Sequence, residues 1–140
     1  MIMNQLSVFV ENKQGRLAAI TKILADQKID IRALSIADTK EYGILRLIVS
    51  DPVQAESALR ENGFTVSITK VIGIGIDDHP GGLCSAMEIL RDNAISVEYM
   101  YAFISRSASK AYVILRVGDN ERAIEKLSAG GFHIMESDIL

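Results

Sequence analysis

Two glycine-containing segments of the chain, residues 11–17 and 77–83, have the residue types of an anion-binding corner. Each follows an alternating apolar stretch, contains a glycine (Gly15 or Gly81) and precedes apolar residues at helical spacing. The first amide groups of a helix have no partner within the helix and carry the positive end of its dipole. Such a corner favours a carboxylate or another anion, although a glycine here can equally serve a purely structural tight turn.

The side chains at the start of the two segments add a second kind of chemistry. Asn12 offers an amide with both donor and acceptor capacity, whereas its counterpart Asp78 is an anion that could hold an amino group. A carboxylate-binding helix end beside an ammonium-binding oxygen suits a small zwitterion. The two segments, if both bind, need not be equivalent.

The remaining reactive residue types do not form a recognisable catalytic or metal pattern. His79 lies beside Pro80 and is either a ligand contact or a solvated loop residue, and His133 has no cysteine or carboxylate at metal-ligand spacing. We expect Cys84 to be a small buried helix residue rather than a nucleophile. Asp77 and Asp78 alone would make a poor cation site. The sequence therefore predicts no enzyme activity, no cofactor and no bound metal.

The two segments belong to an internal repeat that runs through the whole chain. The pattern from Val8 to Leu17 returns 66 residues later, and after a two-residue insertion the shift becomes 68, so that Asp51 and Gly63 return as Asp119 and Gly131. A period near 70 residues is too long for a solenoid, so each copy should be a small domain. We place the domains at residues 1–70 and 71–140, and expect their apolar surplus to pack copy against copy or chain against chain.

Each copy shows the same order of secondary-structure signals. In the first, strands are expected at 5–11, 29–37, 44–49 and 64–69, with helices at about 15–28 and after Pro52; in the second, strands at 71–76, 95–104, 110–117 and 132–137, with helices at 83–92 and 120–129. Leu17 belongs to the apolar stripe of the first helix. Asp51 and Asp119 are the expected N-caps, and Asn62-Gly63 and Gly130-Gly131 the expected helix ends. The join near residue 70 has almost no loop.

This order is the β-α-β-β-α-β arrangement of ferredoxin-like domains. The fold class is therefore α+β, with two βαββαβ domains whose antiparallel sheets carry helices on one face. Gly73 and Gly75 alternate with isoleucines in the first strand of the second copy. They indicate either a close approach to that backbone or a locally weak strand.

Composition narrows the function classes. The net charge is −3; residues 1–70 carry nine basic and eight acidic groups, and residues 71–140 carry six and ten. Neither half has the basic footprint of a nucleic-acid-binding protein. No signal peptide or apolar segment of membrane-spanning length is evident, and a single cysteine fits a reducing compartment, so we expect a cytoplasmic protein without a membrane partner.

The repeated segments resemble the signature of the ACT domain, an amino-acid-sensing module of many biosynthetic enzymes. The residues that carry the resemblance are 10–17 (Val-Glu-Asn-Lys-Gln-Gly-Arg-Leu) and 26–31 (Asp-Gln-Lys-Ile-Asp-Ile), with a less complete match at 79–83 and 93–97. The resemblance covers essentially the whole chain as two tandem domains. It implies domains side by side that bind a free amino acid where the first loop of one meets the second strand of its neighbour.

The resemblance also implies which residues contact the ligand. In serine-sensing members the contacts come from the position of Asn12 and from a polar residue before the second strand, here Asp30; those members have a histidine where this chain has Val10, which argues against serine. The residues that we expect to bind the ligand are Asn12, Gln14, Gly15, Arg16, Leu17 and Asp30 in the first copy, and Asp78, His79, Gly81, Gly82, Leu83 and Ser96 in the second.

Three functions stay open at this point. The first is a sensor of a free amino acid with a regulatory role in amino-acid metabolism, as a dimer or larger homo-oligomer. The second is a non-catalytic subunit that docks on a biosynthetic enzyme, because the N-terminal half also resembles the ACT region of the acetolactate synthase regulatory subunit. The third, an acylphosphatase-like enzyme, needs a phosphate-binding arginine loop and a strand asparagine, and fold alone does not confer the activity.

Overall fold

The protein forms two compact units in the computed structural model, which describes residues 2–38, 40–104 and 110–136. The N-terminal unit comprises Asn4–Thr69. The C-terminal unit comprises the described residues from Lys70 onward, together with Ile2 and Met3.

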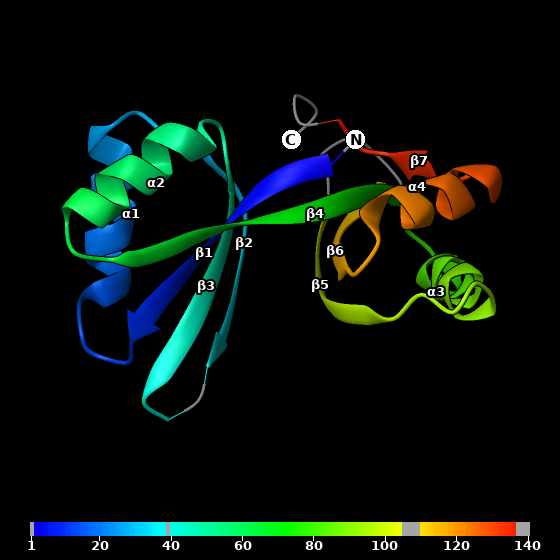
Figure 1. Cartoon of the computed structure of the whole chain (residues 1–140), viewed down its shortest axis with the longest axis horizontal. Helices are drawn as coiled ribbons and strands as arrows, with labels where there is room; N and C mark the ends of the chain where they lie inside the picture. Colours follow the sequence, from blue (N-terminus) through cyan, green and yellow to red (C-terminus); the bar gives the residue numbers. More distant parts are fainter. Residues whose placement is uncertain (1, 39, 105–109, 137–140) are drawn as a thin grey trace. The chain divides into compact units, whose positions relative to one another are not determined.

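The N-terminal unit has four strands and two helices in the expected order. They are β1 (Ile2–Glu11), α1 (Arg16–Asp26), β2 (Ile31–Asp38), β3 (Tyr42–Val49), α2 (Pro52–Glu61) and β4 (Thr65–Asp77), of which β4 continues into the C-terminal unit. The strands lie in the order β2-β3-β1-β4, and α1 and α2 cover one face of the sheet (Figure 1). Leu6, Val8 and Val10 alternate along β1 and are buried against the helices, as their spacing predicts.

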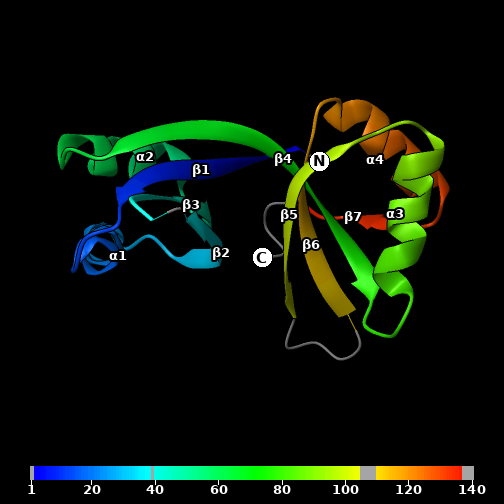
Figure 2. The ribbon, with the colours of Figure 1, turned by 90° about the horizontal axis from the view of Figure 1, so that it is seen from below.

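The C-terminal unit repeats this arrangement. After β4 it contains α3 (Gly82–Asp92), β5 (Val97–Ile104), β6 (Lys110–Val117), α4 (Asn120–Ala129) and β7 (His133–Ile134). The strand order is β5-β6-β4-β7, and α3 and α4 lie on the same side of the sheet (Figure 2). The α+β fold with two βαββαβ units is therefore confirmed. β7 is shorter than the expected strand at 132–137, of which Ser137 lies outside the described residues.

The helix ends form as the sequence predicts. The carboxylate of Asp51 accepts a hydrogen bond from the amide of Gln54 at 3.1 Å, and that of Asp119 accepts one from Arg122 at 3.0 Å. Gly63 and Gly131 follow α2 and α4 with φ of 85° and 90°, which a side chain would make unfavourable. The two caps and two glycines fix where the second helix of each unit begins and ends.

The glycines of β4 are approached by the protein's own side chains. Ile72, Ile74 and Ile76 are buried in the core on one face. On the other face, a Cβ added to Gly73 would lie 2.7 Å from Cε of Met3 and 2.9 Å from Sδ of Met135. Of the two alternatives that the alternating glycines left open, the close approach is found at Gly73, where two methionines occupy the space.

The predicted burial of Cys84 is wrong, and the apolar stripe of α1 is only partly buried. Cys84 is exposed on α3, where its thiol donates a hydrogen bond to the Glu88 carboxylate at 3.2 Å, and this contact raises the pKa of the thiol. Leu17 is 46% exposed, whereas Ile20 and Leu24 of the same helix are completely buried. Both residues lie on α-helical turns beside the buried stripe rather than within it.

Candidate functional site

The loop between β1 and α1 presents the N-terminal end of a helix without a side-chain cap. Gly15 adopts a left-handed conformation with φ of 85° and ψ of −4°, and its carbonyl accepts the amide of Ala19 at 3.0 Å. Because Gly15 has no side chain, it cannot satisfy the amides of the first turn as a serine or aspartate would. The amide of Arg16 donates to the Lys13 carbonyl at 3.4 Å, so the following amides of the first turn, together with the helix dipole, make this position suitable for a carboxylate.

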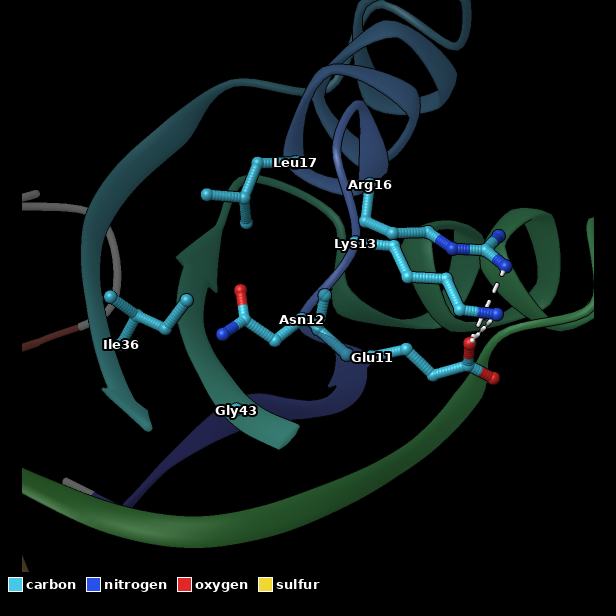
Figure 3. A pocket seen from close by; sticks show the side chains of 8 residues that line it. Glu11, Asn12, Lys13, Arg16, Leu17, Ile36 and Gly43 are labelled. Atoms are coloured by element: carbon cyan, nitrogen blue, oxygen red, sulfur yellow. Dashed lines mark ion pairs between the residues drawn. The ribbon is translucent and has the colours of Figure 1, made fainter. Parts of the chain in front are cut away.

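Asn12 is fixed in the loop by its backbone and by its side chain. Its backbone amide donates to the carbonyl of Glu41 at 2.9 Å, and its Nδ2 donates to the carbonyl of Lys40 at 3.0 Å. This second bond assigns Nδ2 as the donor and directs Oδ1 to the side of Leu17, as Figure 3 shows. An oxygen acceptor held beside a helix N-terminus can bind an ammonium group.

A pocket of about 100 Å³ opens between this loop and the strands β2 and β3. Its aliphatic wall comprises Val10, Leu17 and Ile36, and Gly43 contributes backbone without a side chain. Leu17 and Ile36 are each 46% exposed. Figure 3 shows both side chains on the same side of the loop as the Asn12 amide.

The charged side chains of the loop form their own cluster. Glu11 Oε2 lies 2.8 Å from Nζ of Lys13 and 3.8 Å from Nη2 of Arg16. The hydrogen bond and positive charge of Lys13, with a smaller contribution from Arg16, lower the pKa of the Glu11 carboxyl. Figure 3 shows the three side chains directed away from Leu17 and Ile36, so the ionic and aliphatic sides of the pocket are separate.

The corresponding loop of the C-terminal unit has a similar backbone but different side-chain packing. Gly81 is left-handed with φ of 91°. The amide of His79 donates to the backbone carbonyl of Asp77 at 2.9 Å, as the amide of Lys13 does to the backbone carbonyl of Glu11 at 2.8 Å. Gly82 replaces Arg16 and is buried; a Cβ there would overlap the carbonyl oxygen of Asp77. This loop is therefore packed too tightly for any larger residue after its left-handed glycine.

The side chains of this second loop are differently engaged. Nζ of Lys110 lies 2.6 Å from the Asp77 carboxylate and lowers its pKa. His79 is exposed, with Nδ1 2.9 Å from the Pro80 carbonyl, and Asp78 is exposed. Leu83, the counterpart of Leu17, packs against the core of its unit. The second loop thus lacks the half-exposed leucine that marks the first.

Comparison with known proteins identifies the fold family. Residues 1–138 match the family model described as "ACT domain pair". The chain belongs to this ACT family. Protein BT0572 from Bacteroides thetaiotaomicron is similar to it, with 39% identity, coverage of 98% of this chain and 94% of that one, and a TM-score of 0.93.

More distant ACT-type structures share the fold alone. The regulatory subunit of aspartate kinase from Thermus thermophilus, in its ligand-free form, has a TM-score of 0.67 at 14% identity, with 90% of this chain and 91% of that chain covered. A structure of aspartokinase alpha and beta subunits has a TM-score of 0.53 at 19% identity, with 91% and 95% covered. No curated protein matches the chain.

Two predicted ACT ligand residues lie far from the loop of their own unit. Asp30 precedes β2, where its amide donates to Oγ of Ser50 at 3.0 Å; Ser96 precedes β5 in the equivalent place. Because Asp38 pairs with Gly43 at the opposite end of β2, Asp30 is separated from the pocket by the length of that strand. Each ACT unit therefore brings together its loop residues but not its strand-two residue.

The sequence prediction omitted several residues that line the first pocket. Asn12, Arg16 and Leu17 were predicted, and Gln14 and Gly15 lie in the same loop; the additional lining residues are Val10, Glu11, Lys13, Ile36 and Gly43. The period-two pattern of β2 places Ile36 on the helix-facing side, but only the sheet register shows that it lies beside Gly43.

Among the described residues, no three His, Cys, Asp or Glu side chains are arranged to hold a metal ion. Arg116 on β6 pairs with Glu98 on β5, with Nε 3.2 Å from Oε2. Within the described part of the chain, no helix is both long and apolar enough to cross a membrane.

Proposed function

We propose that the protein is a non-catalytic regulatory sensor that binds a free α-amino acid in the β1–α1 pocket of its N-terminal ACT unit. The observation that carries the proposal is the meeting of three features in one pocket. These are the uncapped helix end after Gly15, the oriented Oδ1 of Asn12, and the half-exposed Leu17 and Ile36.

Each feature recognises a different part of an amino acid. The amides of the first turn of α1 would bind the carboxylate, because they carry the positive end of the helix dipole. Oδ1 of Asn12 would accept a hydrogen bond from the ammonium group. The side chain of the ligand would then lie on the aliphatic side. Binding would act as a signal by favouring one conformation of the chain or its partner over another.

Thermal unfolding of the whole chain with each of the twenty amino acids tests this proposal. One or a few amino acids should raise the melting temperature by several degrees, since ligand at about 100 times its Kd stabilises a protein by ~2.7 kcal/mol. A panel without any shift would contradict the proposal.

Two glycine variants locate the site. Gly15→Ala and Gly81→Ala each place a Cβ in open space at positive φ, so both should lose about 1 kcal/mol of stability from backbone strain alone. Only Gly15→Ala should also weaken the response to the amino acid. An equal loss of response in both variants, or in Gly81→Ala alone, would place the site elsewhere.

A second candidate function is docking on a biosynthetic enzyme. Phe9, Tyr42 and Ile44 are 44%, 46% and 39% exposed, and Phe9 pairs with Ile44 on the sheet face away from the buried Val8 and Leu45. The rings of Phe9 and Tyr42 lie 4.9 Å apart. Aromatic and aliphatic side chains of this kind are typical of protein interfaces, including those of homodimers.

Light scattering and affinity capture distinguish the kinds of docking. A homodimer that dissociates in Ile44→Ser would assign the face to a second copy of the chain. A captured biosynthetic enzyme, acetolactate synthase for example, that is lost in the same variant would assign it to a heterologous partner. Retention of both associations in Ile44→Ser would remove this face as the docking surface.

A further inference from the structure

We infer that the N-terminal pocket selects amino acids with a compact aliphatic side chain, and that the C-terminal loop has no equivalent selectivity. This inference rests on the proposed function and specifies the ligand class of the same pocket. It comes from the wall of the pocket, its charges, its volume and its comparison with the second unit.

The wall of the pocket is aliphatic where the ligand side chain would lie. Leu17 does not join the core of its unit, whereas its counterpart Leu83 packs against the C-terminal core. Ile36, on β2, is as exposed as Leu17. An apolar ligand group between these two side chains would remove them from water, which favours binding.

The charged lining residues do not offer a partner to a charged ligand side chain. Glu11 pairs with Lys13 and Arg16, and Figure 3 shows all three on the opposite side of the loop from Leu17 and Ile36. A carboxylate or ammonium placed against the aliphatic wall would lose water without gaining an ion pair. The pocket should therefore discriminate against aspartate, glutamate, lysine and arginine.

The volume of the pocket favours a small ligand side chain. It is about 100 Å³, smaller than the apolar cavity of about 150 Å³ that holds a benzene ring. The side chains of valine, leucine and isoleucine are therefore better suited to it than an aromatic ring.

Gly43 keeps this volume open, and the C-terminal unit has an alanine at the equivalent position. A Cβ at Gly43 would lie 3.5 Å from Ile36, an ordinary contact distance, so alanine would fit the strand while filling part of the pocket. In the C-terminal unit the same register position is Ala111, opposite Ile76 as Gly43 is opposite Val10. The position of Ile36 is taken by Ala102, so among the described residues the C-terminal unit has a smaller side chain at this point of the wall.

Calorimetric titration of the whole chain with L-valine, L-leucine, L-isoleucine, L-aspartate and L-lysine tests the inference. The three aliphatic amino acids should bind and the two charged ones should not. Gly43→Ala should weaken L-leucine binding about tenfold or more, as expected when one methyl group of space is lost. Gly118→Ala, which adds a Cβ in open space, is the matched control and should bind as the unmodified chain does.

The outcomes separate the two proposals. Binding of a charged amino acid with Gly15-dependent affinity would overturn the aliphatic selectivity and leave the amino-acid sensor standing. Unchanged L-leucine affinity in Gly43→Ala would likewise overturn the selectivity. The absence of binding by all twenty amino acids would overturn both.

Discussion

The two β–α loops of this chain have nearly the same backbone and yet differ in how their side chains pack. Both turn through a left-handed glycine, and both begin with the same short hydrogen-bonded turn after the strand. In the N-terminal loop, Leu17 is half-exposed beside a pocket. In the C-terminal loop, Leu83 is partly buried against the core, and Gly82 is enclosed by the loop itself. The loop backbone is therefore repeated in both units, whereas the side chains that surround it differ.

The two loops should differ most in how much stability they lose when the residue after the left-handed glycine is changed. Gly82→Ala would place a Cβ against the carbonyl oxygen of Asp77, and because backbone must shift, we expect a loss of about 2–3 kcal/mol in the free energy of unfolding. Arg16→Ala at the equivalent position should cost less than about 1 kcal/mol, since its ion pair is long and exposed. Urea denaturation measures both; similar losses would mean that the loops are packed alike.

The second difference concerns the paired leucines. Leu83→Ala should destabilise the protein by about 1–2 kcal/mol, because a partly buried side chain leaves the core. Leu17→Ala should change stability by about 0.5 kcal/mol or less, but should weaken the thermal response to an aliphatic amino acid. If Leu17→Ala is the more destabilising variant, the pocket is part of the core rather than a binding site.

The smallest difference concerns pH. The pKa of Glu11 is lowered from its usual 4.5 mainly by the hydrogen bond from Lys13, and that of Asp77 from its usual 3.8 mainly by Lys110. A carboxyl whose pKa is lower in the folded state stabilises the fold above its unfolded pKa, and this contribution disappears as the pH falls through the folded value.

The Glu11–Lys13 and Asp77–Lys110 ion pairs should contribute differently to the pH dependence of stability, because only one of them needs the folded chain to form. Lys13 is two residues from Glu11 and can remain near it in the unfolded chain, whereas Lys110 reaches Asp77 from another strand, 33 residues away. We therefore expect Lys110→Gln to flatten the loss of stability between pH 5 and pH 3 more than Lys13→Gln does. Unfolding measured at several pH values, with carboxyl NMR titration, checks this; the opposite order would contradict it.

The fold could be predicted largely from local sequence signals. The aspartate caps at Asp51 and Asp119, the glycines after the helices and the alternation of Leu6, Val8 and Val10 each act over a few residues, and each prediction is confirmed. The repeat supplied each signal twice. The burial of individual helix residues was harder to predict, because it depends on how much of the helix the sheet covers. Cys84 and Leu17 both lie on a helix and are exposed.

The candidate site was predictable only in part for the same reason. Residues 12–17 are contiguous, so a local pattern could find the loop. Ile36 and Gly43 are separated from it by 19 residues or more and join it through the register of β2, β3 and β1.

By itself the sequence determined the repeat, the ACT-type order of elements, the helix ends and the glycine turns, because periodicity, capping and positive φ are short-range effects. Tertiary structure alone decided which of two similar loops keeps a leucine exposed, which strands complete the wall and where the charges of the loop are directed. These depend on side-chain packing between segments distant in sequence, and a local pattern does not specify such contacts.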